Sequence, residues 1–396
     1  MPVYLVVFLG YIGYSLFLTI FAPALLQHNY IEHEHSTRML LLGVIIFMYP
    51  FGQFVSSPVL GALSDRFGRK PLLIYSLAIT TLVYILIGIC LINKWIWIMM
   101  GALFVAGLSE GNVTIAQSAV ADISTKRTRH RMFGYIYFAG SCSYVIGPIL
   151  GGWLATRNLT HHGHSYYLPF FFVALLLLIC LMWVALSFRE TAEKQSNVSY
   201  IDGLTNIKNL FTQRKLRFWF LVNFILYLAA FGFLQGFPIY VIAHYGISVR
   251  KLSMMIAWTD IPFLVVNLFL IDYLSKKIHT IRLLLISSLV LGVAMVLMIV
   301  PNHEDWLWPL LFINGLSAAI ILTESTALIS LIGGEHEQGR ALGVNQSLNF
   351  LTEAVSGLVV GLLSAAYLKL TILMLGCMGF VAALLLLLRR KSMPTI

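Results

Sequence analysis

Long apolar runs, separated by short polar segments, follow one another along the whole chain. A helix of about 20 apolar residues crosses the roughly 30 Å hydrocarbon core of a bilayer, so each run predicts a transmembrane helix. Twelve spans are expected, at residues 3–26, 39–62, 71–92, 96–122, 132–155, 169–188, 217–244, 251–275, 281–300, 307–331, 341–366 and 369–388. The predicted fold class is therefore an all-α integral membrane protein.

Composition points to the same class, because 59% of the 396 residues are hydrophobic and only 11% are charged. Soluble domains carry about 25% charged residues. The segments between the predicted spans are too short for a soluble catalytic domain, so we expect no enzyme activity and no cofactor. The sequence also lacks a Gly-x4-Gly-Lys-Ser/Thr loop, which argues against a pump driven by nucleotide hydrolysis.

The net charge of +10 does not predict a nucleic-acid partner, because the basic residues sort by side of the membrane. If the N-terminus is cytoplasmic, all but six of the 26 Lys and Arg residues fall in cytoplasmic loops. The exceptions lie in or beside outer loops: Arg38, Lys94, Arg157, Arg250, Lys251 and Lys369. The positive-inside rule therefore predicts a multi-pass protein of the cell membrane with both termini in the cytoplasm.

The chain also repeats itself with an offset of 208 residues, since Phe104-Val-Ala-Gly-Leu-Ser109 in the fourth span matches Phe312-Ile-Asn-Gly-Leu-Ser317 in the tenth. Two pseudo-symmetric six-helix bundles are expected at residues 1–188 and 217–396, the second with a short cytoplasmic tail. A polar cytoplasmic linker at 189–216 joins them. Parallel repeats of this kind form transporters that bind their solute near the midplane, between the halves.

The loop after the second span reads Gly61-Ala-Leu-Ser-Asp-Arg-Phe-Gly-Arg-Lys-Pro71 and closely resembles the signature loop of the major facilitator superfamily. The resemblance implies a cytoplasmic gate formed by Gly61, Asp65, Arg66, Gly68, Arg69 and Asp122. Asp65 would accept hydrogen bonds at a helix N-terminus, and Arg69 would pair with a carboxylate such as Asp122. The alternative, a loop that serves only as a topology signal, leaves Asp65 and the glycines unexplained.

Within that superfamily the first half looks most like the tetracycline and multidrug efflux branch, through Pro58-Val-Leu-Gly61 and Ala121-Asp122-Ile123. The segment with Gly147, Pro148, Gly151 and Gly152 resembles a motif associated with proton antiporters, although such small residues also suit close helix packing. Two positions depart from the branch. Leu103 stands where the branch has an arginine, and Tyr14 stands where tetracycline carriers have an acidic residue.

Four carboxylates fall inside the predicted spans: Glu110, Glu353, Asp260 and Glu324. Ionisable groups are costly in a bilayer, so each is a functional hypothesis by default. Burial favours the neutral form of a carboxyl group, which suits a reversible proton carrier. The alternative for each is a protonated structural carboxyl, or a loop residue that the span boundaries misplace.

The resemblance further implies that spans 1, 4, 7 and 10 line a cavity and that spans 2, 5, 8 and 11 flank it. Their polar side chains are candidates to contact the solute: Tyr11, Tyr14, Gln53, Asn112, Gln117, Tyr144, Asn223, Tyr227, Gln235, Trp258, Asn314, Gln346 and Asn349. Each is equally suited to an interhelical hydrogen bond. A cavity with acids and no Lys or Arg compensates a cation better than an anion, which favours a cationic or neutral solute.

Histidines gather in two predicted outer loops, where His33, His35, His161, His162 and His164 are the weak candidates for a metal site. Neither loop has a regular ligand spacing, and surface histidines are usually only solvated. We therefore expect no metal site.

The leading prediction is a bacterial inner-membrane transporter that exports a small organic solute in exchange for protons and works as a monomer by alternating access. Two alternatives stay open: a proton symporter that imports a nutrient or metal chelate, and a non-transporting receptor or enzyme on the same scaffold. The expected partners are the solute, the proton as coupling ion and the lipid bilayer. The sequence does not identify the solute.

Overall fold

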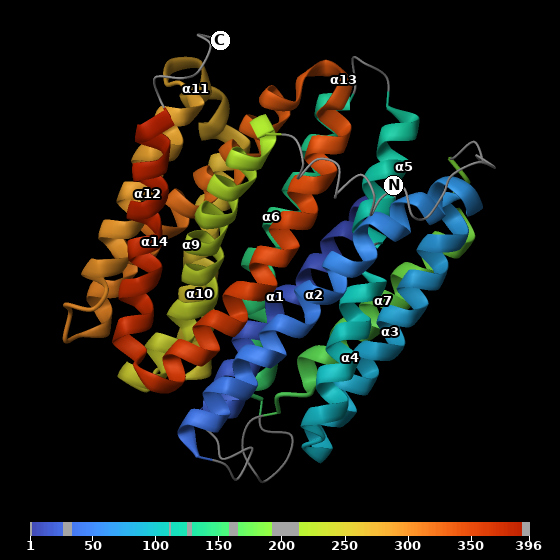
Figure 1. Ribbon diagram of the computed structural model, residues 1–396. Helices are drawn as coiled ribbons and strands as arrows, with labels where there is room; N and C mark the ends of the chain where they lie inside the picture. The colour runs from blue at the N-terminus through green and yellow to red at the C-terminus, as the bar shows by residue number, and fades with distance from the viewer. Residues whose placement is uncertain are drawn as a thin grey trace.

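The computed structural model describes residues 2–26, 34–110, 112–124, 129–157, 165–191 and 214–389, and some side chains within these ranges, such as that of Asp65, lie outside the description. Twelve helices of the described part are long and apolar enough to cross a membrane, which confirms the predicted fold class (Figure 1). The elements are α1 (Pro2–Leu26), α2 (His35–Phe67), α3 (Arg69–Asn93), α4 (Ile96–Ser109), α5 (Asn112–Ile123), α6 (Arg129–Ala155), α7 (Leu168–Ser187), α9 (Arg214–Tyr245), α10 (Val249–Val265), η1 (Val266–Leu270), α11 (Ile271–Lys277), α12 (Thr280–Leu297), η2 (Glu304–Trp306), α13 (Leu307–Ala366) and α14 (Leu368–Arg389).

We refer to α1–α7 as the first half and to α9–α14 as the second half. The linker end of the molecule is the end at which α2 meets α3 and α9 begins, and it lies toward the top of Figure 1 with α11. The boundaries of the predicted linker stay a prediction, because residues 192–213 lie outside the described part.

The long element α13 holds two spans, Glu304–Ile329 and Ala341–Ala366, although its helical backbone is unbroken. Both of its ends lie beside the same end of α9. Lys251, which follows α9, pairs with the carboxylate of Glu304, and Ala366 lies in a depression with His244. The helical path therefore turns back on itself between the two spans.

Two spans that the sequence predicts as single helices are interrupted. The fourth span changes from α4 to α5 at Glu110, whose backbone N–H bonds to the carbonyl of Ala106 while its own carbonyl accepts from Val113 N–H, at 3.2 Å. The eighth span passes from α10 into a five-residue π-helical turn, η1, a few residues after Pro262. Such turns locally widen a helix and often occur near functional sites.

The two halves touch through small residues at the end opposite the linker. A Cβ on Gly43 of α2 would lie 2.8 Å from the Cα of Gly361 in α13. A Cβ on Gly152 of α6 would lie 1.9 Å from the hydroxyl oxygen of Ser253 in α10. An added Cβ would clash at both places. Helix α2 therefore packs closely against α13, and α6 packs closely against α10.

At the linker end, the described glycines make no comparable approach to the other half. Gly134, near the start of α6, and Gly343, in the second span of α13, have no described atom within 4 Å of an added Cβ. Helix α5, which runs to the linker end, packs against α1, α2, α3 and α6 of its own half. Among the described residues, the closest glycine approaches between the halves therefore lie at the end opposite the linker.

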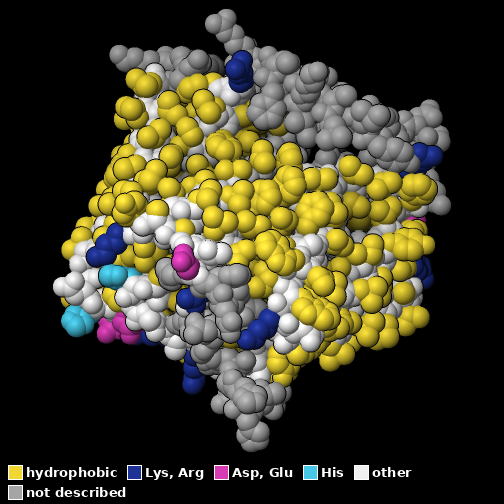
Figure 2. Space-filling model, turned by 60° about the horizontal axis from the view of Figure 1, so that its bottom comes forward, with side chains coloured by type: hydrophobic (Ala, Val, Ile, Leu, Met, Phe, Trp, Pro, Cys, Tyr) yellow, Lys and Arg dark blue, Asp and Glu magenta, His cyan; other side chains and the backbone are white. Residues whose placement is uncertain are grey.

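Apolar side chains cover the sides of the bundle, as Figure 2 shows from the end opposite the linker. Exposed tryptophans, including Trp97, Trp153 and Trp306, lie near the ends of their helices. Aromatic residues of this kind favour the boundary between lipid and water. The surface is therefore that of a protein immersed in a bilayer.

Candidate solute and proton site

A hydrogen bond joins the two halves in the middle of the bundle. Tyr14, halfway along α1, donates its hydroxyl to the Oε1 atom of Glu353 in the second span of α13. Glu353 is only 7% exposed. Two residues that the sequence proposes for different roles, solute contact and proton transfer, are thus direct partners.

The backbone of Glu353 is held by two further side chains of the second half. Gln235 of α9 donates from Nε2 to the Glu353 carbonyl at 3.2 Å. The hydroxyl of Ser356 bonds to the same carbonyl at 2.7 Å and donates to Gln235 Oε1, also at 2.7 Å. These bonds fix the helical turn that carries Glu353, and the predicted solute contact Gln235 serves here as a support.

A group of tyrosines surrounds this link on the side of the first half. Tyr14 stacks on Tyr49 of α2 with ring centres 5.0 Å apart and meets Tyr144 of α6 edge-on at 6.3 Å. Tyr11 lies 5.5 Å from Tyr144. Tyr49 was not among the predicted residues, although it precedes the candidate Gln53 by four residues, which is about one helical turn.

Glu110 approaches the same region from the break in the fourth span. Its Oε2 accepts from Gln53 Nε2 at 3.2 Å, and its Oε1 has no partner among the described residues. Glu110 is 3% exposed, and its charge and that of Glu353 lie close enough to interact. The structure therefore brings together the two acids from opposite halves that the sequence proposes as proton carriers.

The other two predicted acids lie farther from this centre. Asp260 is buried on α10, where its charge is within reach of Tyr144. Glu324 is buried near Thr280, at the start of α12 and close to the linker end. Its neighbour Thr323 donates to Asn267 of the π-helical turn at 3.0 Å. Asp260 thus borders the central group, whereas Glu324 lies inside the second half.

Three predicted solute contacts take part in, or lie beside, a hydrogen-bond network within the second half. Asn345 of α13 accepts from Asn223 of α9 at 3.0 Å and donates to the Tyr227 hydroxyl at 2.8 Å. Tyr227 also lies 3.3 Å from the Thr326 hydroxyl. Asn223 and Tyr227 are fully buried, so their contacts tie α9 to α13, while Gln346, next to Asn345, is exposed.

The remaining solute candidates are spread over several environments. Asn112 is fully buried at the start of α5, and its amide has no partner in the part of the chain that is described. Asn314 is buried against Met298 at the end of α12, and Trp258 lies partly exposed with its indole N–H bonded to the Trp308 carbonyl. Gln117 and Asn349 are half-buried.

The predicted gate is built around Arg69, the first residue of α3. Its Nε lies 3.0 Å from Asp122 Oδ2 near the end of α5, and its Nη1 donates to the Ser64 hydroxyl. The Thr191 hydroxyl also donates to Asp122, at 3.2 Å. Arg66 is exposed, and the backbone of Gly61 lies in α2, but the side chain of Asp65 lies outside the described part. The ion pair expected between Arg69 and Asp122 is present.

Sequence reasoning missed Glu190, which closes this cluster from the end of the first half. Its carboxylate accepts from the backbone N–H groups of Arg69, at 2.7 Å, and Lys70, at 3.0 Å. These groups lack helical partners because they begin α3, and a carboxylate there also complements the helix dipole. Gly68 adopts φ 100° and a Cβ there would lie 2.5 Å from the Glu190 carboxylate, so the motif glycine makes room for this cap.

The second predicted motif serves helix packing in this structure. A Cβ on Gly147 would lie 1.9 Å from the Ser15 hydroxyl of α1, and one on Gly151 would lie 2.6 Å from Leu16. Gly152 faces α10 of the other half, as described above. Pro148 lies in the same turn of α6. The motif therefore seats α6 between α1 and α10.

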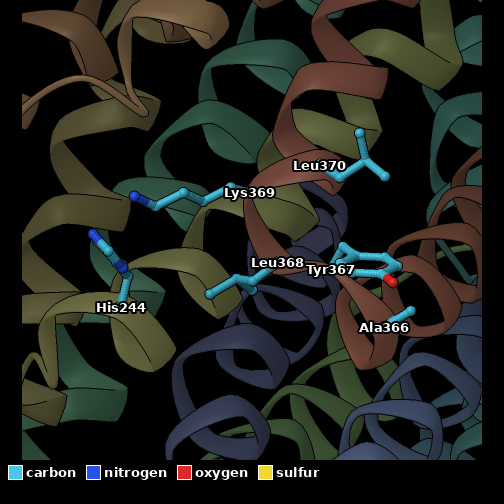
Figure 3. A pocket seen from close by; sticks show the side chains of 6 residues that line it. All are labelled: His244, Ala366, Tyr367, Leu368, Lys369 and Leu370. Carbon is cyan, nitrogen blue, oxygen red and sulfur yellow. The ribbon is translucent and has the colours of Figure 1, made fainter.

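The histidines considered as metal ligands lie largely outside the described residues. The described residues contain no group of three potential metal ligands, and His33, His161, His162, His164 and the side chain of His35 lie outside them. One open depression of about 610 Å³ lies beside the turn from α13 to α14. In Figure 3 the side chain of Lys369 extends toward His244, and Leu368 lies to one side of them. This depression, lined by the exposed basic residues His244 and Lys369 and by leucines, does not match the predicted solute site with its buried acids.

These features define a membrane transporter: two helical bundles that enclose a buried polar centre and pack closely at the end opposite the linker. The model of the Major Facilitator Superfamily matches residues 3–259 and 219–395, so the chain belongs to that superfamily. The family that the loop from Gly61 to Pro71 predicted is therefore confirmed.

Two relatives come from bacteria. The chain is 30% identical over 228 residues to the tetracycline resistance protein, class H, of Pasteurella multocida, and the match covers 57% of this chain and 54% of that protein. It is 26% identical over 364 residues to multidrug resistance protein 1 of Bacillus subtilis (strain 168), with 90% and 87% covered. The chain thus spans about half the length of the first relative and most of the second.

Solved structures share the fold. A bacterial homolog of the human lysosomal transporter Spinster, in an inward-facing and occupied conformation, superposes with a TM-score of 0.77 at 13% identity, over 99% of this chain and 96% of that one. The human organic anion transporter TETRAN superposes with a TM-score of 0.70 at 20% identity, over 97% and 99%. At these identities the likeness extends to the fold alone.

Proposed function

We propose that this transporter exports a small cationic or neutral organic solute in exchange for protons. The observation that carries the proposal is the pairing of Tyr14 with Glu353 across the halves, beside Glu110. A buried carboxyl group that is exposed first to one side of the membrane and then to the other suits a proton carrier. Glu353 and Glu110 are two such groups in the same region.

The chemistry of the centre favours a cation or a neutral solute over an anion. Its named groups are carboxylates, phenols and amides, among them Glu110, Glu353, Tyr11 and Tyr144. Carboxylates compensate a positive charge, and tyrosine faces attract organic cations. The bacterial relatives, whose names describe tetracycline and multidrug resistance, support export of such compounds.

The shape supports alternating access with the linker end open. The Gly43–Gly361 and Gly152–Ser253 approaches close the opposite end, and no described glycine of the linker end makes a comparable contact with the other half. We assign the linker end to the cytoplasm of a bacterial inner membrane, because the positive-inside rule places both termini there. The chain then faces inward and works as a monomer, since one chain supplies both bundles.

A proteoliposome experiment tests this function and its direction. In vesicles with an acidic lumen, protons leaving through an antiporter drive ethidium into the lumen, and tetracycline serves as a second solute. We expect accumulation that collapses when a protonophore removes the gradient. Accumulation only when the exterior is acidic would instead identify a proton symporter, and gradient-independent fluxes equal to those of empty vesicles would refute proton-coupled transport of these solutes.

A further inference from the structure

The link between the halves joins a tyrosine of the first half to an acid of the second. Tyr14 of α1 has no carboxyl group of its own but donates to the carboxylate of Glu353, which belongs to the other half. The acid that the first span lacks is therefore supplied from the eleventh span. Protonation of Glu353 and separation of the halves therefore both act on the same hydrogen bond.

The strength of such a bond depends on the charge of its acceptor. A hydrogen bond to a carboxylate is roughly twice as strong as one between neutral groups. Protonation of Glu353 therefore weakens the bond, and a cation beside the same carboxylate competes with the Tyr14 hydroxyl for it. The bond is strongest when Glu353 is ionised and the site holds no solute.

The groups that face Glu353 come from four other elements. Tyr11 and Tyr14 lie on α1, Tyr144 lies on α6, and Gln235 of α9 supports its backbone. Glu110, between α4 and α5, is the acid whose charge interacts with it. Asp260 of α10 reaches Tyr144 rather than Glu353. The Tyr14 hydroxyl is the side-chain donor that the structure places on the Glu353 carboxylate.

We propose that the Tyr14–Glu353 bond is a tie that holds the empty, unprotonated carrier in one arrangement of its halves. A proton on Glu353, or a cationic group of the solute beside it, releases the tie and allows the halves to rock. In the proton step the Glu353 carboxylate takes a proton from a hydronium ion, which leaves as water, and the Tyr14 hydroxyl keeps its own proton. Tyr14 is thus a positioning residue that acts through Glu353.

This inference rests on the proposed proton-coupled export and explains how that export avoids leakage. An antiporter loses its gradient if the empty carrier changes sides, because protons and solute then move independently. The tie raises the cost of that movement only in the empty, ionised state. Hydrogen bonds to charged groups contribute enough to change the equilibrium between the two arrangements roughly 10-fold to 100-fold.

The test measures the separation of the halves without any solute. Spin labels at Tyr75 in α3 and Tyr273 in α11, both exposed and toward the linker end, report this distance by pulsed electron resonance in lipid nanodiscs. The labels replace these tyrosines by cysteine in a chain whose four native cysteines are removed. The matched control is Tyr49→Phe. The Tyr49 ring stacks on Tyr14, but its hydroxyl has no hydrogen-bond partner among the described residues.

We expect the distance distribution of the unsubstituted chain to change between mildly alkaline and mildly acidic buffer. Tyr14→Phe and Glu353→Gln should both give the acidic distribution at either pH, while Tyr49→Phe should keep the change. A wild-type response in Tyr14→Phe, or in Glu353→Gln should Tyr14→Phe fail to fold, would overturn the tie. The measurement needs no transport, so a chain that passes it but moves neither ethidium nor tetracycline would contradict only the proposed solutes.

Discussion

The two halves place their polar groups at different depths. In the first half the strong polar cluster lies at the linker end, where Arg69 bonds to Asp122 and Glu190 caps α3 near the membrane boundary. In the second half the network of Asn223 and Asn345 lies inside a helix crossing. Polar groups near water can part and be rehydrated, whereas buried ones cannot part without a large cost. The first half therefore holds breakable contacts, and the second behaves as a rigid unit.

The largest loss of stability is expected from Arg69→Ala. Arg69 is 7% exposed, and its removal leaves the Asp122 carboxylate without its ion pair. The side chain of Asp122 is 25% exposed and can be partly rehydrated, but losing a hydrogen bond between charged groups still costs up to about 3 kcal/mol. The unfolding midpoint in detergent should fall clearly, while Arg66→Ala at the exposed neighbouring site should leave it almost unchanged. Equal midpoints in the two variants would show that the cluster does not stabilise the first half.

Asn345→Ala tests the rigid network of the second half and should have the next largest effect. It removes one hydrogen-bond partner each from Asn223 and Tyr227, and the loss of two buried hydrogen bonds costs about 2 kcal/mol. The same substitution at exposed Gln346 is the control. Hydrogen exchange of α9 should quicken only in the Asn345 variant. If both variants exchange alike, the network is not what makes this half rigid.

Glu190→Ala is expected to have the smallest effect of the three. The carboxylate acts as a cap for two backbone N–H groups of α3, and caps contribute about 1 kcal/mol. Thermal unfolding in detergent should show a small decrease, and Arg189→Ala, at the adjacent exposed residue, should show none. A decrease as large as that of Arg69→Ala would mean that the cap and the ion pair act as one unit.

The fold follows from features that act locally along the chain. Apolar length alone locates the spans, and the loop from Gly61 to Pro71 identifies the family, because neither depends on distant contacts. The interruption at Glu110 and the π-helical turn after Pro262 escape such reasoning, since an apolar run looks the same whether or not its helix is continuous. The reversal inside α13 escapes it for the same reason.

The site is harder to predict because its partners are far apart in sequence. Glu110 and Glu353 are recognisable as costly buried acids, but nothing in the sequence pairs Tyr14 with a residue of the eleventh span. Glu190 looks like one of the first charges of the linker, yet it caps a helix that begins at Arg69. Hydropathy reports which groups are buried, whereas their pairing is decided by how the two bundles meet.

The central claim is that Glu353, paired with Tyr14 and close to Glu110, carries the coupled proton. The most direct measurement compares two activities of Glu353→Gln and Glu110→Gln in the same proteoliposomes: accumulation of ethidium driven by an acidic lumen, and exchange of external for internal ethidium without a gradient. The account predicts that Glu353→Gln abolishes accumulation and retains exchange, and that Glu110→Gln weakens accumulation. Wild-type accumulation in both variants would remove these acids from the mechanism.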